Sequence, residues 1–319
     1  MLKFSIIVPC YNMEENIDNL LEMLCADNYS DYEVIYVDDC SKDNTYARMC
    51  EAVKGYPNYH VYQTPVNGGP GVARNFGLDK ASGENILFCD SDDIFDISCL
   101  AKIDDFLKTH ADADIVVFPY EIARKYGREI RDTYKKCNDG EKISVLSVAE
   151  GAPSPCAKVY KNSIISENNL RFPSQRIGED ACFLMYYIPY IKNAYKSGIS
   201  YYTYVMRSGS LTHQKRKVEE VQTFYDKFLP TCRAYFPEGE IRMFVNGHLL
   251  SKAKIMTEMG CSSKEISDWF KEANALYPNW IEKIDYEKQG IYRKLIYRAM
   301  YKSSGIMIKM IMALRRILY

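Results

Sequence analysis

The sequence lacks any surplus of charge, because 41 lysine and arginine side chains are balanced by 42 aspartate and glutamate side chains in 319 residues. Proteins that bind nucleic acid usually carry a basic surplus, so we expect no nucleic-acid partner. The eleven cysteines include no Cys-x-x-Cys pair and no grouping with histidine at zinc-ligand spacing. Cysteines inside apolar runs, such as Cys89 and Cys182, are typical of reduced, buried thiols in a cytosolic protein.

Long hydrophobic runs are also missing. The longest uncharged run in the second half, Ala181–Ile191, has eleven residues and contains Pro189, which is too little to span ~30 Å of hydrocarbon as a helix. The apolar run before Pro9 is too short for a signal peptide. We therefore expect a cytoplasmic protein with no integral membrane segment.

The first 118 residues alternate β-rich runs with helical patterns. Hydrophobic strands separated by helices are typical of an α/β fold with a mostly parallel sheet covered on both faces. The expected strands are Phe4–Val8, Glu33–Val37, His60–Gln63, Asn85–Cys89 and Ile115–Phe118, and the expected helices are Glu14–Cys25, Asp43–Lys54 (with Ser41 as a candidate N-cap), Gly71–Ala81 and Ser98–His110.

A polar, irregular segment at 119–150 separates this half from a second patterned stretch. There we expect strands at Cys156–Tyr160 and Ile199–Val205 with a helix at Glu179–Ile191 between them, and a helical pattern from about Lys217 to the end. The predicted organisation is one domain at 1–215, with halves 1–118 and 119–215, followed by a helical region at 216–319.

Polar residues stand where three predicted strands end: Pro9–Asn12, Asp38 with Asp39, and Asp90–Asp93. Ligands bind at the carboxyl ends of parallel strands, so these residues should converge on one site. Asp90 and Asp92, with Ser91 between them, form an Asp-x-Asp pattern whose carboxylates could hold Mn²⁺ or Mg²⁺ together with a nucleotide diphosphate. The alternative is a solvated acidic turn, which the buried strand before it disfavours.

Asp38 and Asp39 allow two interpretations, a hydrogen bond to a nucleobase or ribose and a helix-capping turn, and each carboxylate can take one of them. The glycine-rich segment Asn67–Gly77 leads into a helix, where backbone N–H groups favour anions. Arg74 lies one turn in, placed to contact a diphosphate. A dehydrogenase fingerprint is disfavoured, because Arg74 occupies the position of its third glycine.

Four segments occur in series: Ser-Ile-Ile-Val-Pro-Cys-Tyr-Asn (5–12), Val-Asp-Asp-Cys-Ser-Lys-Asp-Asn-Thr (37–45), Ala-Arg-Asn-Phe-Gly (73–77) and Phe-Cys-Asp-Ser-Asp-Asp (88–93). Together they resemble the family-2 glycosyltransferases of the GT-A fold, and the resemblance covers roughly residues 1–210.

The resemblance implies roles for individual positions. Pro9 and Tyr11 would flank the nucleobase and Asp39 would bond uracil. Asp90 would contact ribose and sugar, and Asp92 would be the metal ligand. Cys10 departs from the commoner Thr or Ser, which removes one hydroxyl contact. The expected nucleotide-sugar site is Pro9, Tyr11, Asn12, Glu14, Asp39, Gly69, Arg74, Asp90, Ser91 and Arg207.

Gly178-Glu179-Asp180 matches the family's Glu-Asp pair, in which the aspartate is the general base of an inverting transfer. Alternatively, Glu179 and Asp180 only complement the dipole of the helix that they open. Arg207 or His213 would close over the diphosphate, or their loop is simply solvated. The Gln-x-x-Arg-Trp motif of processive members is absent from the sequence, so one sugar per encounter is expected.

The stretch Lys288–Tyr319 holds eight basic residues and no acidic one. On a helix from Lys302, basic side chains share one face and apolar ones lie largely opposite, which predicts peripheral contact of residues 288–319 with an anionic membrane. Packing of the apolar face on the first domain is the alternative. The basic residues are Lys302, Lys309 and Arg316, and the apolar ones are Ile306, Met310, Leu314, Ile317 and Leu318.

The resulting hypothesis is a metal-dependent enzyme that moves one hexose or N-acetylhexosamine from a UDP-sugar to a saccharide or lipid-linked saccharide, in cell-surface polysaccharide synthesis. A nucleotidyltransferase of related fold would usually carry a glycine-rich loop with Arg and Lys after strand one, where this chain has Cys10–Glu15. A catalytically silent sugar-nucleotide or membrane-binding scaffold is the third possibility, and the intact Asp92 and Asp180 argue against it.

Overall fold

The computed structural model describes residues 2–17, 29–124, 126–151, 154–174, 178–206, 249–284, 286 and 289–318. The chain divides into two compact units, Met1–Ser210 and Leu211–Tyr319. Each unit is described by itself.

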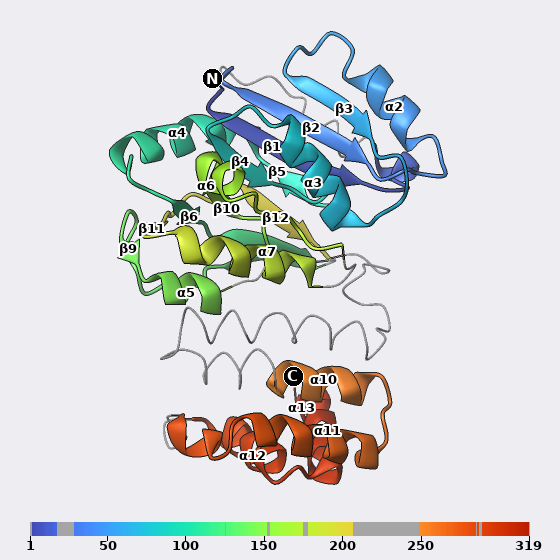
Figure 1. Ribbon diagram of the computed structural model, residues 1–319, viewed down its shortest axis with the longest axis vertical. Helices are drawn as coiled ribbons and strands as arrows, with labels where there is room; N and C mark the ends of the chain where they lie inside the picture. The colour runs from blue at the N-terminus through green and yellow to red at the C-terminus, as the bar shows by residue number, and fades with distance from the viewer. Residues whose placement is uncertain are drawn as a thin grey trace. The chain divides into compact units, whose positions relative to one another are not determined.

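The larger sheet of the first unit has eight strands in the order β3-β2-β1-β4-β10-β6-β11-β9 (Figure 1). Its first half is parallel, and every residue of β1, β2 and β4 is buried, whereas the edge strand β3 is partly exposed. Burial on both faces explains why β1, β2 and β4 are mainly hydrophobic instead of alternating. The four strands are β1 (Phe4–Cys10), β2 (Tyr32–Asp38), β3 (Tyr59–Gln63) and β4 (Asn85–Phe88).

The second half of this sheet is mixed. β10 (Lys158–Lys161) runs antiparallel to β4 and to β6 (Ile115–Val117), and β11 (Ala194–Lys196) is parallel to β6 and antiparallel to β9 (Lys142–Ile143). The strand predicted at Cys156–Tyr160 therefore begins two residues later. The structure adds two short strands that the sequence pattern did not predict, β11 inside the sheet and β9 at its edge.

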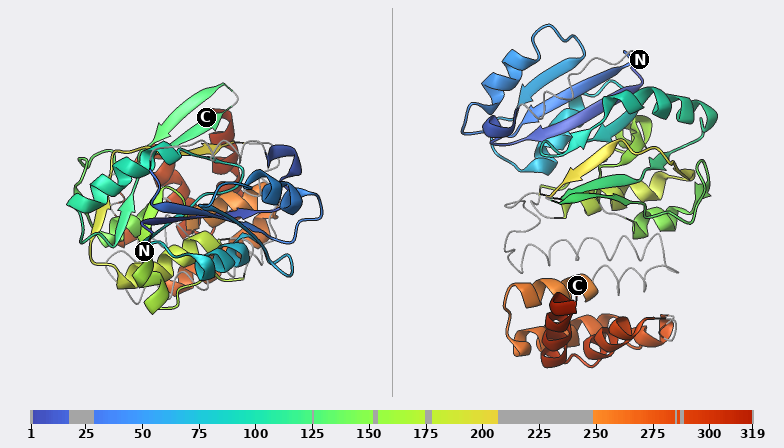
Figure 2. Two further views of the ribbon diagram at one scale, coloured as in Figure 1. Left: turned by 90° about the horizontal axis from the view of Figure 1, so that it is seen from above. Right: turned by 180° about the vertical axis from the view of Figure 1, so that it is seen from behind.

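A smaller sheet has the order β5-β12-β7-β8, with β5 at Ile94–Phe95 and β12 at Tyr202–Val205. The strand predicted at Ile199–Val205 is thus only its last four residues. β7 (Tyr120–Arg124) and β8 (Gly127–Arg131) form a hairpin that projects from the first unit in the view from above (Figure 2, green). All five residues of β8 are exposed.

The helices predicted at 43–54, 71–81, 98–110 and 179–191 are found within two residues of their expected bounds when the 3-10 turns are counted, whereas α5 and α6 were not predicted, and α5 lies in the segment expected to be irregular. α3 begins with Pro70, whose fixed φ suits a first helical position and whose missing N–H is not needed there. α3 and α7 lie on the same face of the larger sheet (Figure 1). Of the helix predicted at Glu14–Cys25, only the 3-10 turn η1 and residue 17 belong to the described residues. The elements are η1 (Glu14–Asn16), α2 (Thr45–Ala52), α3 (Pro70–Lys80), η3 (Ile97–Cys99), α4 (Leu100–Thr109), α5 (Val145–Glu150), α6 (Asn162–Glu167), α7 (Glu179–Tyr187) and η4 (Ile188–Tyr190).

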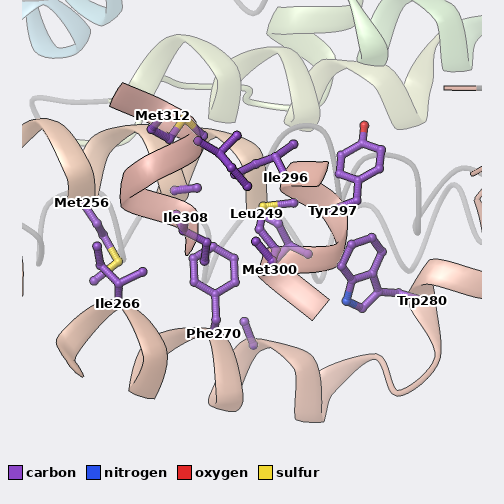
Figure 3. Close-up of a cluster of buried hydrophobic side chains, with 14 residues drawn as sticks. Leu249, Met256, Ile266, Phe270, Trp280, Ile296, Tyr297, Met300, Ile308 and Met312 are labelled. Atoms are coloured by element: carbon purple, nitrogen blue, oxygen red, sulfur yellow. The ribbon is translucent and has the colours of Figure 1, made fainter. Parts of the chain in front are cut away.

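The described part of the second unit is helical around its own hydrophobic core (Figure 3). α11 opens with a capping box, in which Ser262 and Glu265 each bond the other's backbone N–H. Trp280 and Phe270 are fully buried in the core. The elements are α10 (Leu250–Glu258), α11 (Ser263–Leu276), η7 (Trp280–Lys283), α12 (Ile291–Tyr301) and α13 (Gly305–Leu318).

The last helix begins at Gly305, not at Lys302 as the sequence pattern predicts. α12 ends at Tyr301, and Ser303 adopts a left-handed conformation (φ 50°) that breaks the helix. α13 presents two faces: Ile308, Ile311 and Met312 are buried in the core, whereas other apolar side chains of the helix are exposed. No helix in the described ranges has the length and apolarity that crossing a bilayer requires.

Candidate active site

The carboxyl ends of β1, β2 and β4 lie side by side, because these strands are parallel neighbours in the order β2-β1-β4. Cys10 at the end of β1 pairs in register with Asp38 at the end of β2. Asp90 follows β4 by two residues. The polar strand ends predicted from the sequence therefore meet at one edge of the sheet, and this edge defines the candidate site.

Pro9 and Tyr11 flank the last residue of β1. Pro9 is buried within the strand, whereas Tyr11 is 41% exposed just beyond it. An exposed aromatic ring at this edge offers a flat surface on which a base can stack. The geometry is compatible with the predicted nucleobase contact of Tyr11.

Asn12 and Glu14 connect the segment after β1 with the loop after β2. Asn12 accepts a hydrogen bond from the Lys42 N–H at 3.0 Å and donates its own N–H to Ser41 Oγ at 2.8 Å. Glu14 accepts from the backbone and side-chain amides of Asn44 at 3.0 and 2.8 Å. These hydrogen bonds lower the pKa of the Glu14 carboxyl. Both predicted ligands thus have partners within the chain and hold two loops of the site together.

Asp39 is buried and organises the glycine-rich loop. Its Oδ1 accepts hydrogen bonds from Thr64 Oγ1 and the Gly68 N–H, each at 3.0 Å, and its Oδ2 accepts from the Gly69 N–H at 2.6 Å. A carboxylate that satisfies two consecutive backbone donors fixes the entry into α3. The sequence did not predict this contact. The predicted hydrogen bond to uracil would have to use the acceptor capacity of Asp39 that these three hydrogen bonds leave free.

Arg74 joins the two sides of the site. Its Nη2 donates to Asp90 Oδ1 at 2.7 Å, and its Nη1 donates to Asp180 Oδ1 at 2.7 Å and Glu179 Oε1 at 3.2 Å. The Arg74 side chain is 3% exposed, and its guanidinium lies over the Phe172 ring, 5.2 Å from the centroid. The structure thus brings together three predicted site residues, Arg74, Asp90 and Asp180, through one guanidinium.

The packing of α3 and α7 explains how these distant residues meet. A Cβ at Gly71 would lie 3.0 Å from the Pro173 carbonyl oxygen and 3.3 Å from Glu179 Cγ, so a glycine permits this close approach. Phe183 of α7 stacks on Phe172 at 4.0 Å between ring centroids. These contacts hold the first turn of α7 beside α3, and Arg74 reaches across.

The cluster sets three carboxylates against one guanidinium. Burial, and then the adjacent Asp180, raises the pKa of Glu179 to about 8, while Arg74 acts in the opposite direction. Burial also raises the pKa of Asp180, and Arg74 is the main group that opposes the rise. The Glu179 side chain is 8% exposed and that of Asp180 is 30% exposed. Burial thus raises the pKa of both carboxyls, and the side chain of Asp180 is the more exposed of the two.

Ser91 and Asp92 lie half-buried after β4. Within the described ranges, no three His, Cys, Asp or Glu side chains form a cluster that could hold a metal ion. The groups here that could ligate a metal are individual carboxylates. Mg²⁺ is commonly bound by one or two carboxylates together with substrate phosphates. This donor set fits a divalent cation that binds together with a nucleotide diphosphate.

Two buried charged residues that the sequence reading did not single out border the cluster. Lys158 of β10 donates to the Ser154 carbonyl oxygen at 2.6 Å, and burial lowers its pKa to about 8. Asp93 accepts hydrogen bonds from the Tyr202 hydroxyl and from the Val205 N–H, the latter at 2.8 Å, and so joins the end of β4 to β12. A lysine inside a buried strand is the signal that could have found Lys158.

Arg207 and His213, predicted to close over the diphosphate, lie outside the described residues.

Residues 5–168 match the family described as Glycosyl transferase family 2. The match covers half of the chain, so the chain belongs to this family. The resemblance seen in the four sequence segments is thereby confirmed.

Two curated relatives are poly(ribitol-phosphate) transferases. The chain is 32% identical over 231 residues to the poly(ribitol-phosphate) beta-N-acetylglucosaminyltransferase TarS of Staphylococcus aureus (strain Mu50), covering 71% of this chain and 39% of that protein. It is 30% identical over 286 residues to the poly(ribitol-phosphate) beta-glucosyltransferase of Bacillus spizizenii (strain W23), covering 85% of this chain and 44% of that protein. The chain therefore spans less than half the length of either relative.

The fold is that of a solved family member. The crystal structure of S. aureus TarS 1-349 in complex with UDP-GlcNAc matches with a TM-score of 0.69 at 24% sequence identity, covering 99% of this chain and 92% of that one. This likeness confirms the predicted GT-A fold with a C-terminal helical region.

Proposed function

We propose that this protein is an inverting glycosyltransferase that moves one hexose or N-acetylhexosamine from a UDP-sugar to a saccharide or lipid-linked saccharide acceptor. Residues 1–215 would form the catalytic domain, and the product would contribute to cell-surface polysaccharide synthesis on the cytoplasmic side of the membrane.

The observation that carries this proposal is the arrangement around Arg74. One guanidinium contacts Asp90, at the carboxyl end of β4, and Asp180, in the first turn of α7, each at 2.7 Å. One guanidinium thus holds both a donor-side carboxylate and the candidate base. An in-line displacement needs both groups within reach of one sugar.

In the proposed reaction, Asp180 takes the proton of an acceptor hydroxyl while the oxygen of that hydroxyl attacks the anomeric carbon. A new carbon–oxygen bond forms, the bond from the anomeric carbon to the diphosphate breaks, and UDP leaves with the bonding electrons. The single displacement inverts the anomeric configuration. Asp39, Tyr11 and Pro9 would bind the uridine end, and Asp90 the ribose and sugar.

Asp92 would hold the divalent cation, Mn²⁺ or Mg²⁺, together with the diphosphate. When bound, the cation would offset the negative charge that develops on the leaving group. The Gly68 and Gly69 N–H groups at the entry of α3 already donate to Asp39, so the cation would be the main partner of the diphosphate charge in this proposal.

The names of two relatives narrow the acceptors worth testing. Both name poly(ribitol phosphate), and one names N-acetylglucosamine and the other glucose as the transferred sugar. We infer that UDP-GlcNAc and UDP-glucose are the first donors to test, and that a polyol-phosphate polymer belongs in the acceptor panel beside lipid-linked saccharides.

A peripheral membrane contact through the last two helices would bring the enzyme to such acceptors. Apolar side chains of α13 that are exposed in the structure support it, and no acidic residue occurs between 288 and 319 to repel an anionic surface. Lys309 is an exception within the predicted basic face, since its Nζ donates to the Cys261 carbonyl oxygen at 2.9 Å. The exposed apolar side chains are Ile306, Met307, Met310 and Leu314.

The test is a matrix of UDP-sugars and acceptors with Mn²⁺ or Mg²⁺, with and without EDTA, read by UDP release and by product mass. We expect transfer of one sugar with one donor class, and its loss on chelation. Absence of both UDP binding and transfer across the matrix would refute the proposed function, and full activity in EDTA would refute the metal.

A further inference from the structure

In the structure, Arg74 is engaged by the protein's own carboxylates. Its side chain is 3% exposed, and both terminal nitrogens are engaged with carboxylates. Phe172 covers the guanidinium, with 5.2 Å between its central carbon and the ring centroid. The guanidinium of Arg74 is therefore enclosed by the three carboxylates and the Phe172 ring.

The acids that it holds come from two separate elements. Asp90 follows β4, and Glu179 with Asp180 opens α7, about a hundred residues further along the chain. A guanidinium is a rigid planar fork, so fixing one terminal nitrogen on Asp90 also fixes the direction in which the other meets Asp180. Removing one partner from such a buried cluster leaves the others uncompensated.

We propose that Arg74 is a positioning residue, which holds Asp180 in the orientation that a general base needs and ties that base to the donor-side Asp90. This inference rests on the proposed function, and it replaces the diphosphate contact expected from the sequence. Arg74 acts through Asp180, and no contact of its own with the reacting atoms is required.

The charged and titratable groups around Asp180 determine how its pKa would change if Arg74 were removed. Glu179 is on the same helix, Arg74 comes from α3, Asp90 from the end of β4, and Lys158 and Tyr160 from β10. Burial raises the pKa of Asp180, Asp90 adds to the rise, and Arg74 is the largest of the opposing groups. Without Arg74 the pKa of Asp180 should rise further, so less of the base would be ionised at neutral pH.

The experiment compares R74Q and R74K with the wild-type protein in kcat, donor KM, UDP affinity by calorimetry, and the pH dependence of kcat. We expect R74Q to lose about 100-fold in kcat, the size of loss that misplacing a reacting group causes. Its acid limb should move to higher pH, while the affinity for UDP stays close to that of the wild type. R74K keeps the charge but not the fork, so its pH limb should move less while kcat still falls.

R171Q is the matched control. Arg171 pairs with Asp79 of α3 at 2.7 Å, the same distance as Arg74 has to Asp90 and Asp180, but both side chains are at least 35% exposed. We expect its kcat, pH profile and UDP affinity to equal those of the wild type. Thermal melting of each variant checks folding, and R74K decides the question if R74Q does not fold.

Two results would overturn the inference. A loss of UDP affinity that matches the loss of kcat/KM would make Arg74 a diphosphate ligand, and an unmoved acid limb would show that Arg74 does not act through Asp180. A wild-type protein that transfers no sugar fails the proposed function itself, whereas an active wild type with unaffected Arg74 variants fails this inference alone.

Discussion

Asp39→Asn is a sharp test of whether the buried carboxylate after β2 serves the fold, the nucleotide, or both. Asp39 is 3% exposed and accepts three hydrogen bonds, from Thr64 Oγ1, the Gly68 N–H and the Gly69 N–H. The asparagine amide has nearly the same shape, but it replaces one accepting oxygen by a donating NH₂ group. At least one of the three donors must then face another donor.

The expected cost follows from the kind of hydrogen bond that is lost. A hydrogen bond to a charged group contributes about 1.5–3 kcal/mol, and an unsatisfied buried donor costs a similar amount. We therefore expect D39N to lower the free energy of unfolding of the first unit by about 2–4 kcal/mol. For a unit of this size each kcal/mol shifts the melting temperature by about 2–4 °C, so a decrease of about 4–16 °C should be seen.

The assay is thermal melting by circular dichroism together with UDP calorimetry, with D31N as the control. Asp31 also accepts a backbone hydrogen bond, from the Lys3 N–H at 3.2 Å, but it is exposed, so D31N should melt like the wild type. The reasoning is refuted if D39N keeps the wild-type melting temperature. Loss of UDP affinity in such a stable variant would assign the carboxylate to the nucleobase alone.

Three further predictions concern the acid cluster and the helical unit. Because burial raises the pKa of Glu179 to about 8, the folded protein retains a proton that the unfolded chain releases near pH 4.5, so stability should fall as pH rises between these values. The melting temperature of E179Q should fall less from pH 5 to pH 8.5 than that of the wild type, and equal slopes would contradict the assignment. A Cβ at Gly305 would lie 2.0 Å from the backbone oxygen at the start of α11, so G305A should lower stability by about 1–3 kcal/mol in urea unfolding. G290A, where a Cβ meets nothing within 4 Å, should behave as wild type. The variant I306S/M310S/L314S replaces three exposed apolar residues of α13 by serine. It should no longer sediment with anionic vesicles, while its behaviour with neutral vesicles and its melting temperature stay unchanged. Sedimentation with anionic vesicles that the variant retains would exclude this face as the membrane contact.

Local patterns predicted the first half of the sheet and the meeting of its strand ends, because buried parallel strands leave an unambiguous hydrophobic signature. They failed at the start of α2, where a local hydrogen bond in the preceding loop competes with helix capping. Ser41 was expected to cap α2, but α2 begins at Thr45. The Ser41 backbone N–H and hydroxyl both donate to Asp38, which makes Ser41 part of the loop after β2 instead.

The candidate site shows the same division. The sequence identified Asp90, Asp92 and Asp180 as separate motifs, but not that Arg74 connects Asp90 with Asp180, since that contact depends on how α7 packs beside α3. The role of Asp93 was likewise hidden, because its partners on β12 lie more than a hundred residues away in the chain. Contacts of this kind follow from topology, which no local pattern encodes.

The central claim is that Asp180 is the base of a sugar transfer, and D180N tests it most directly. Turnover of the best UDP-sugar and acceptor pair should be measured alongside UDP affinity for the wild type and D180N. We predict a turnover ~10²–10⁴-fold lower in D180N with UDP affinity retained. Wild-type turnover in D180N, or a collapse of UDP binding that accounts for the lost activity, would contradict the account.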